Sequence, residues 1–146
     1  MNKYISLTVG EIRALTRAEQ KLVNSKDDGI SRNYKYVVLS EFKCTDHEQI
    51  CSITVPEGFL TDGSSGGPSI GCSWLFHDYL YATHRFDNGM SCTRQDADKV
   101  MSVILENDRM FWYACIFRIL AKWNVFWLFS SAWKQSGSRG PEFLEL

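Results

Sequence analysis

The chain has 146 residues, of which 45% are hydrophobic and 23% are charged, and its net charge is -1. This length supports one domain with its own buried core, and the composition is that of a globular protein. The near-neutral charge excludes a strongly basic chain, so we expect no nucleic-acid partner and no electrostatic attachment to anionic membranes.

Cysteine usage and the N-terminus indicate a reducing compartment. The five cysteines are an odd number, and no two are spaced as C-x-x-C, which argues against a disulfide framework and a structural zinc site. The first twenty residues lack the apolar core of a signal peptide. We therefore expect the protein to lie in the cytoplasm or in an assembly that forms there. We do not expect a signal peptide to direct its secretion.

Residues 1–33 form a polar N-terminal segment. Within it Ile12, Leu15, Glu19 and Leu22 recur at helical spacing, which predicts one short amphipathic helix. The stretches "YKYVVLSEF" (34–42) and "QICSITVP" (49–56) are rich in β-branched and aromatic residues, so they predict a small antiparallel sheet over about residues 34–60.

Helical signals follow the sheet. A Gly-rich loop, "TDGSSGGPSIG", leads into a predicted helix over 73–83, and Thr93 with Asp96 forms a capping box that begins a helix to about Asn107. The aromatic run 110–133 predicts a helix to Lys122, a break near Asn124 and a second helix. The class is therefore α+β, with one domain over 34–135, three or four C-terminal helices, and a tail over 136–146.

The aromatic run is long enough to cross a membrane, yet Arg118, Lys122 and Asn124 interrupt its centre. We therefore expect no transmembrane segment, and we disfavour interfacial membrane contact. The large aromatic side chains of the run are expected to be buried against the sheet or a partner chain: Trp112, Phe117, Trp123 and Trp127.

The pair His77 and Asp78 lies inside an apolar helical segment. With Tyr81 it forms H-D-x-x-Y, which brings an imidazole, a carboxylate and a phenol close together on a helix. Asp98 borders the apolar stripe of the next predicted helix, where an unpaired charge is costly, so we expect His77 or Tyr81 to be its partner.

One hypothesis is catalytic: His77 is a general base oriented by Asp98, with Tyr81 as the third catalytic residue. Asp78 and Asp62 would bind a calcium-like divalent cation or position water, and the sequence indicates no other cofactor. The Gly-rich loop would supply backbone groups for an oxyanion or a cation from Gly63, Ser64, Ser65, Gly66 and Gly67.

The other hypothesis is structural. A His-Asp-Tyr cluster also serves as an internal polar junction that joins helices, and such networks perturb pKa values as catalytic ones do. Asp62 fits a turn residue, and His47 and His84 fit solvated or capping histidines. The sequence favours neither the catalytic nor the structural hypothesis.

Three motifs over about residues 55–133 resemble the bacterial and phage family called domain of unknown function 1353. They are "VPEGFLTDGSS", "FHDYLY" and "TRQDADKVM", in the order of that family. The resemblance implies that Asp62, His77, Asp78, Tyr81 and Asp98 occupy motif positions, but it implies no activity. Because such proteins occur in phages and other viruses, a minor capsid or tail component with protein partners, located in the virion, is the alternative to a hydrolase of ester or cell-wall substrates.

The order of the polar residues is also similar to the secreted phospholipases A. Those enzymes place a Gly-rich calcium loop before a helix with H-D-x-x-Y, and a second Asp on an antiparallel helix holds the His. This similarity concerns the design of the site only, because the cysteines that brace such enzymes are missing and the second Asp follows too soon.

Overall fold

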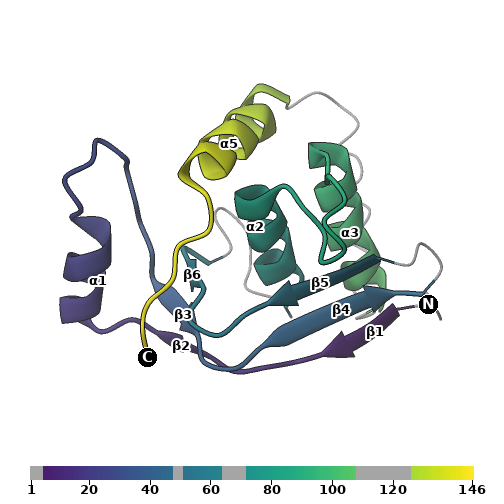
Figure 1. Cartoon of the computed structure of the whole chain (residues 1–146), viewed down its shortest axis with the longest axis horizontal. Coiled ribbons are helices and arrows are strands. Elements are labelled where there is room, and N and C mark those ends of the chain that lie inside the picture. The colour runs from purple at the N-terminus through teal and green to yellow at the C-terminus, as the bar shows by residue number, and fades with distance from the viewer. Residues whose placement is uncertain (1–4, 48–50, 64–71, 108–125) are drawn as a thin grey trace.

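A computed structural model describes residues 5–47, 51–63, 72–107 and 126–146, with the backbone alone at 126–130. The α+β class is confirmed (Figure 1). The elements, in chain order, are β1 Ile5–Thr8, β2 Ile12–Ala14, α1 Arg17–Asn24, β3 Tyr36–Val38, β4 Phe42–Asp46, β5 Cys51–Val55, β6 Leu60–Thr61, α2 Ser73–Thr83, α3 Arg94–Asn107 and α5 Phe126–Arg139.

The strands form two three-stranded antiparallel sheets, ordered β1-β4-β5 and β2-β3-β6, rather than one sheet over 34–60. The predicted strand over 34–42 divides between the two sheets. Its chain bends near Ser40, where the Leu39 and Ser40 amides both donate to the Glu11 carbonyl. The hairpin of β4 and β5 pairs Phe42 with Val55 and Asp46 with Cys51.

The N-terminal segment differs from the prediction of a single helix. It contributes β1 and β2, and Ile12 lies in β2. Helix α1 begins only at Arg17, because Thr16 and Glu19 form a capping box: the Glu19 amide donates to Thr16 Oγ1 and the Thr16 amide to Glu19 Oε2. Leu22, predicted on the apolar face, is 69% exposed.

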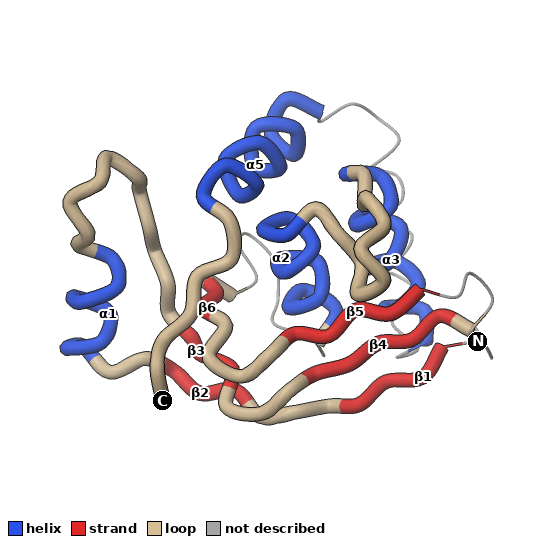
Figure 2. Tube along the Cα trace, viewed as in Figure 1, coloured by secondary structure: helices blue, strands red, loops and turns tan. Residues whose placement is uncertain are grey.

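The main core lies between α2 and the sheets. Leu75, Phe76 and Leu80 of α2 are fully buried with Val38 and Val55 of the strands. Helix α2 also contacts α3 and α5 (Figure 2). The helix that carries the His-Asp pair is therefore held on several sides.

The C-terminal residues are packed rather than forming a free tail. Helix α5 continues to Arg139, and the chain then runs along β6 (Figure 1). The Leu60 amide donates to the Glu142 carbonyl at 3.0 Å, and the Leu144 amide donates to the Gly58 carbonyl at 2.8 Å. The last residues thus extend the hydrogen bonding of the sheet β2-β3-β6.

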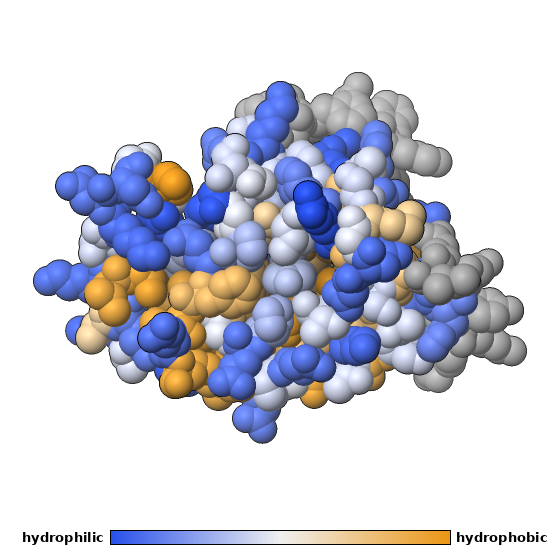
Figure 3. Space-filling view, in the orientation of Figure 1, coloured by the Kyte–Doolittle hydropathy of each residue, from blue (hydrophilic) through white to orange (hydrophobic). Residues whose placement is uncertain are grey.

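No helix in the described part of the chain is long and apolar enough to cross a bilayer. The predicted helix over 110–122, the break near Asn124 and the side chains of Trp112, Phe117, Trp123 and Trp127 lie outside the described residues and side chains. Apolar surface gathers at the end of the molecule that holds α1 and β2 (Figure 3).

Candidate functional site

Helix α2 sets the geometry of the H-D-x-x-Y motif. His77 and Tyr81 are one turn apart on the same face, and their ring centroids are 4.2 Å apart. Leu75, Phe76 and Leu80 anchor the helix in the core. The helix therefore presents both rings on a surface fixed by packing.

Helix α3 supplies the carboxylate opposite these rings. Its start is set by the capping box predicted from the sequence: the Thr93 amide donates to Asp96 Oδ2 at 2.9 Å, and the Asp96 amide donates to Thr93 Oγ1 at 3.2 Å. One turn into the helix, Asp98 faces α2, and its side chain is 3% exposed.

Asp98 binds both His77 and Tyr81 of α2. His77 Nε2 lies 2.8 Å from Asp98 Oδ1, and the Tyr81 hydroxyl donates to the same oxygen at 2.8 Å. The predicted pairing of Asp98 is confirmed for both partners. The structure adds Arg94, whose Nη1 donates to Asp98 Oδ2 at 3.0 Å.

The sequence contained a signal for this third partner. Arg94 and Asp98 are four residues apart on α3, the spacing of a helical ion pair. Arg94 supplies the positive charge that a buried carboxylate needs, and without it the negative charge of Asp98 would be costly to bury.

The hydrogen bonds assign a proton within the cluster. A carboxylate only accepts hydrogen bonds, so His77 Nε2 donates to Asp98 Oδ1. The His77 side chain is 13% exposed. Burial, and then the negative charge of Asp98, raise the pKa of Tyr81 far above its usual value, so Tyr81 acts as a hydrogen-bond donor.

Asp78 belongs to a second group, on the side of β6. The Thr61 hydroxyl donates to Asp78 Oδ2 at 2.7 Å. Burial, followed by the charge of Asp62, raises the pKa of Asp78 well above its usual value, although the Thr61 hydrogen bond opposes the shift. Asp78, which the sequence places beside His77 and Tyr81 on the helix, thus directs its carboxylate to Thr61 of β6. The carboxylate that joins the two rings is Asp98.

The cation prediction concerns this second group. The structure brings Asp62 and Asp78 close together, with Gly63 donating its amide to Thr61 Oγ1 at 3.2 Å. Within the described ranges, no group of three or more His, Cys, Asp or Glu side chains is arranged to hold a metal ion. The remaining loop residues of the prediction lie outside those ranges: Ser64, Ser65, Gly66 and Gly67.

Comparisons with protein-family models, with curated proteins and with solved structures found no match to this chain. Its function is therefore inferred from the geometry of the cluster formed by His77, Tyr81, Arg94 and Asp98, called the His77 cluster below.

Proposed function

We propose that the protein is a small ester hydrolase in which His77 is the general base. The observation that carries the proposal is the 2.8 Å contact between His77 Nε2 and the buried Asp98, on a histidine that keeps 13% of its side chain exposed. A carboxylate that fixes the tautomer and orientation of a histidine is the arrangement that general-base catalysis uses.

In this mechanism, each residue of the His77 cluster has one role. The imidazole nitrogen away from Asp98 takes a proton from water, the resulting hydroxide attacks the ester carbonyl, and the proton is returned to the leaving alkoxide. Asp98 stabilises the imidazolium, and Tyr81 and Arg94 hold Asp98 in place.

The similarity to the secreted phospholipases A supports esters over cell-wall substrates. In both cases a histidine and a tyrosine of H-D-x-x-Y face an Asp from a second helix. In the proposed enzyme Asp62 and Asp78 would hold a divalent cation, which would supply positive charge to the carbonyl oxygen of the ester. Membership of the domain of unknown function 1353 family is likewise a proposal, supported by the order of its three motifs.

The test is hydrolysis of p-nitrophenyl esters and of phosphatidylcholine vesicles, with and without Ca²⁺, by wild type and by His77→Asn. Asparagine can donate to Asp98 but cannot exchange a proton near neutral pH, so the rate should fall by about 10²- to 10⁴-fold. Wild-type protein that hydrolyses neither substrate, or a variant that retains the wild-type rate, would contradict the proposal.

A second candidate rests on the saturation of Asp98. Its carboxylate receives hydrogen bonds from three side chains on two helices, which is the arrangement of a polar junction that fixes helix packing. In that case the protein is a structural component, such as a minor capsid or tail protein of a virion, and His77→Asn would lower stability.

A further inference from the structure

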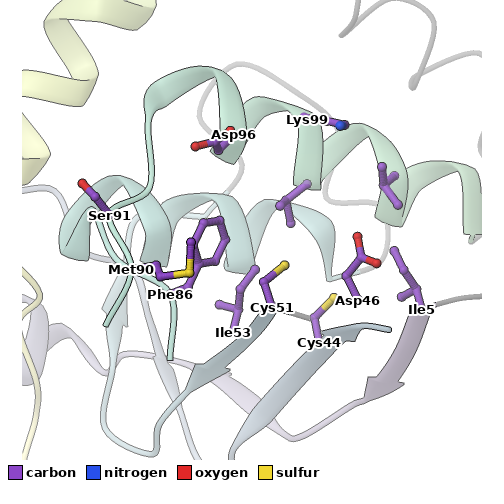
Figure 4. A pocket seen from close by; sticks show the side chains of 12 residues that line it. Ile5, Cys44, Asp46, Cys51, Ile53, Phe86, Met90, Ser91, Asp96 and Lys99 are labelled. Atoms are coloured by element: carbon purple, nitrogen blue, oxygen red, sulfur yellow. The ribbon is translucent and has the colours of Figure 1, made fainter. Parts of the chain in front are cut away.

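A separate cavity of about 210 Å³ lies between α3 and the sheet β1-β4-β5 (Figure 4). Neither His77 nor Asp98 lines it. It exists because α3 packs mainly against α2, so that this part of α3 does not close onto the strands.

The floor of the cavity is one face of the sheet. The strand register places Ile5 opposite Asp46, Asp46 opposite Cys51, and Cys44 opposite Ile53, and side chains two apart in a strand share a face. Figure 4 shows the side chains of Cys51 and Asp46 directed from the strands toward α3. This floor therefore combines apolar side chains, thiols and one carboxylate.

The roof is one face of α3. Asp96, Lys99, Val100 and Val103 follow the spacing i, i+3, i+4 and i+7, and all four line the cavity. The loop between α2 and α3 closes one end of the cavity with Phe86, Met90 and Ser91.

The polar groups of the cavity are predominantly acidic. Asp46 and Asp96 are partly buried, whereas Lys99 is exposed. Burial, then the charge of Asp46, and to a smaller extent that of Asp96, raise the pKa of the Cys51 thiol. Both carboxylates therefore act on the floor of the cavity, where the thiol stays protonated and adds no charge.

We propose that this cavity binds a small organic cation, namely an ammonium group on a single ring or a short alkyl chain. A dry cavity of about 150 Å³ accommodates benzene, so the volume here suits one ring with a short substituent. The ring would contact Ile53 and Val100, and the ammonium group would lie near Asp46 at the end of the cavity that Ile5 lines. An anion of the same size would be repelled by the two carboxylates.

The test is an NMR titration of the full-length ¹⁵N-labelled chain with benzylammonium, benzyl alcohol and benzoate. Benzylammonium should bind at least about tenfold more tightly than benzyl alcohol, should shift the amides of Cys51 and Val100, and should bind more weakly as salt is added. Benzoate should not bind. Equal affinity for the cation and the alcohol, or shifts confined to other regions, would overturn the proposal.

Two variants test whether the preference for benzylammonium over benzyl alcohol arises in the cavity. Asp46→Asn should abolish the tenfold preference, whereas Asp27→Asn, the same change at an exposed residue in a turn, should retain it. If Asp46→Asn does not fold, Val100→Phe serves instead, because the larger side chain fills the cavity and should abolish binding of both probes. Retention of the preference in Asp46→Asn, or of binding in Val100→Phe, would also overturn the proposal.

Discussion

Asp98 has a more deeply buried side chain than either His77 or Arg94, its partners in the His77 cluster. Its carboxylate is almost fully buried, and it accepts hydrogen bonds from the Arg94 guanidinium, from His77 and from Tyr81. Such a group tolerates substitution poorly, because each partner depends on its charge.

We predict that Asp98→Asn lowers the free energy of unfolding by about 3 kcal/mol, because it leaves the Arg94 charge without its counter-charge in a buried site. Urea denaturation measures the change. Asp27→Asn, at an exposed position, should change stability by less than about 0.5 kcal/mol. Equal stability of the two variants would show that the cluster contributes nothing to folding.

We predict that Asp78→Asn, unlike Asp98→Asn, raises the free energy of unfolding near neutral pH. A carboxyl whose folded pKa is raised stabilises the fold below its unfolded pKa and loses that contribution as the pH rises through the folded pKa. Asn has no carboxyl to ionise, so Asp78→Asn avoids this loss of stability as the pH rises. The variant also retains an acceptor for Thr61 and a donor for Asp62, so it should be more stable than wild type near neutral pH.

The pH dependence provides the check on Asp78. The advantage of Asp78→Asn should be small at about pH 4 and should grow toward about pH 7. Thermal melts across that range measure it. A variant less stable than wild type at neutral pH would mean that Asp78 is held as a carboxylate.

At the scale of elements, the helices agreed with the sequence better than the strands did. Helix α2 lies where its apolar pattern placed it, and α3 begins at the predicted capping box because both signals are local. Strand β2 was missed because it has three residues and pairs with β3, more than twenty residues away. The capping box at Thr16 was a visible local signal that would have placed α1 correctly.

The contact between α2 and α5 depends on a glycine. His84 ends α2 in the left-handed conformation, and its ring stacks on Trp133 with centroids 3.6 Å apart. A Cβ added at Gly137 would lie 2.3 Å from His84 Cε1. The ring of His84 therefore occupies the space that any larger residue at Gly137 would need.

We predict that Gly137→Ala destabilises the protein by about 1–3 kcal/mol through steric overlap with the His84 ring. In an ordinary helix interior the same change stabilises by about 0.5–1 kcal/mol. A loss of stability would therefore indicate the overlap with the His84 ring. The double variant Gly137→Ala with His84→Ala should be more stable than expected from the sum of the two single changes in urea denaturation. A stabilised Gly137→Ala would contradict the contact.

At the scale of the whole molecule, the C-terminal residues are anchored to the N-terminal part of the chain. Glu142 accepts from Arg32 Nε at 2.7 Å and from the Tyr34 hydroxyl at 2.8 Å. These partners lie about a hundred residues apart, so no local pattern predicts them. Local patterns therefore predict only a tail over 136–146, whereas the cost of an unpaired buried charge correctly predicts that Asp98 pairs with His77 or Tyr81.

We predict that acid weakens the attachment of the C-terminal residues. Burial alone raises the pKa of Glu142, but the hydrogen bonds from Arg32 and Tyr34 outweigh it, so the pKa lies below its usual value. The hydrogen bonds from Arg32 lower the pKa of Asp28 to about 2. Their stabilisation is present above the unfolded pKa values and is lost as the pH falls through the folded ones.

The expected result is a wild-type stability that declines between about pH 4.5 and about pH 2. Glu142→Gln should be about 2 kcal/mol less stable at neutral pH and should decline less steeply. Glu145→Gln, the same change at an exposed residue of the same segment, should follow the wild-type curve. Identical curves for all three proteins would exclude Glu142 as an anchor.

The central claim is that His77 serves chemistry rather than architecture, and a comparison of two histidine variants by thermal unfolding tests it most directly. His84 is a matched structural control, because Asn tolerates its left-handed backbone while the stacking on Trp133 and the hydrogen bond to the Trp133 carbonyl are lost. In His77→Asn the amide still donates to Asp98, so we expect its melting temperature to fall by less than about 2 °C, and that of His84→Asn to fall by about 4 °C or more. A fall in His77→Asn as large as that in His84→Asn would contradict the claim and assign the His77 cluster to the architecture of the protein.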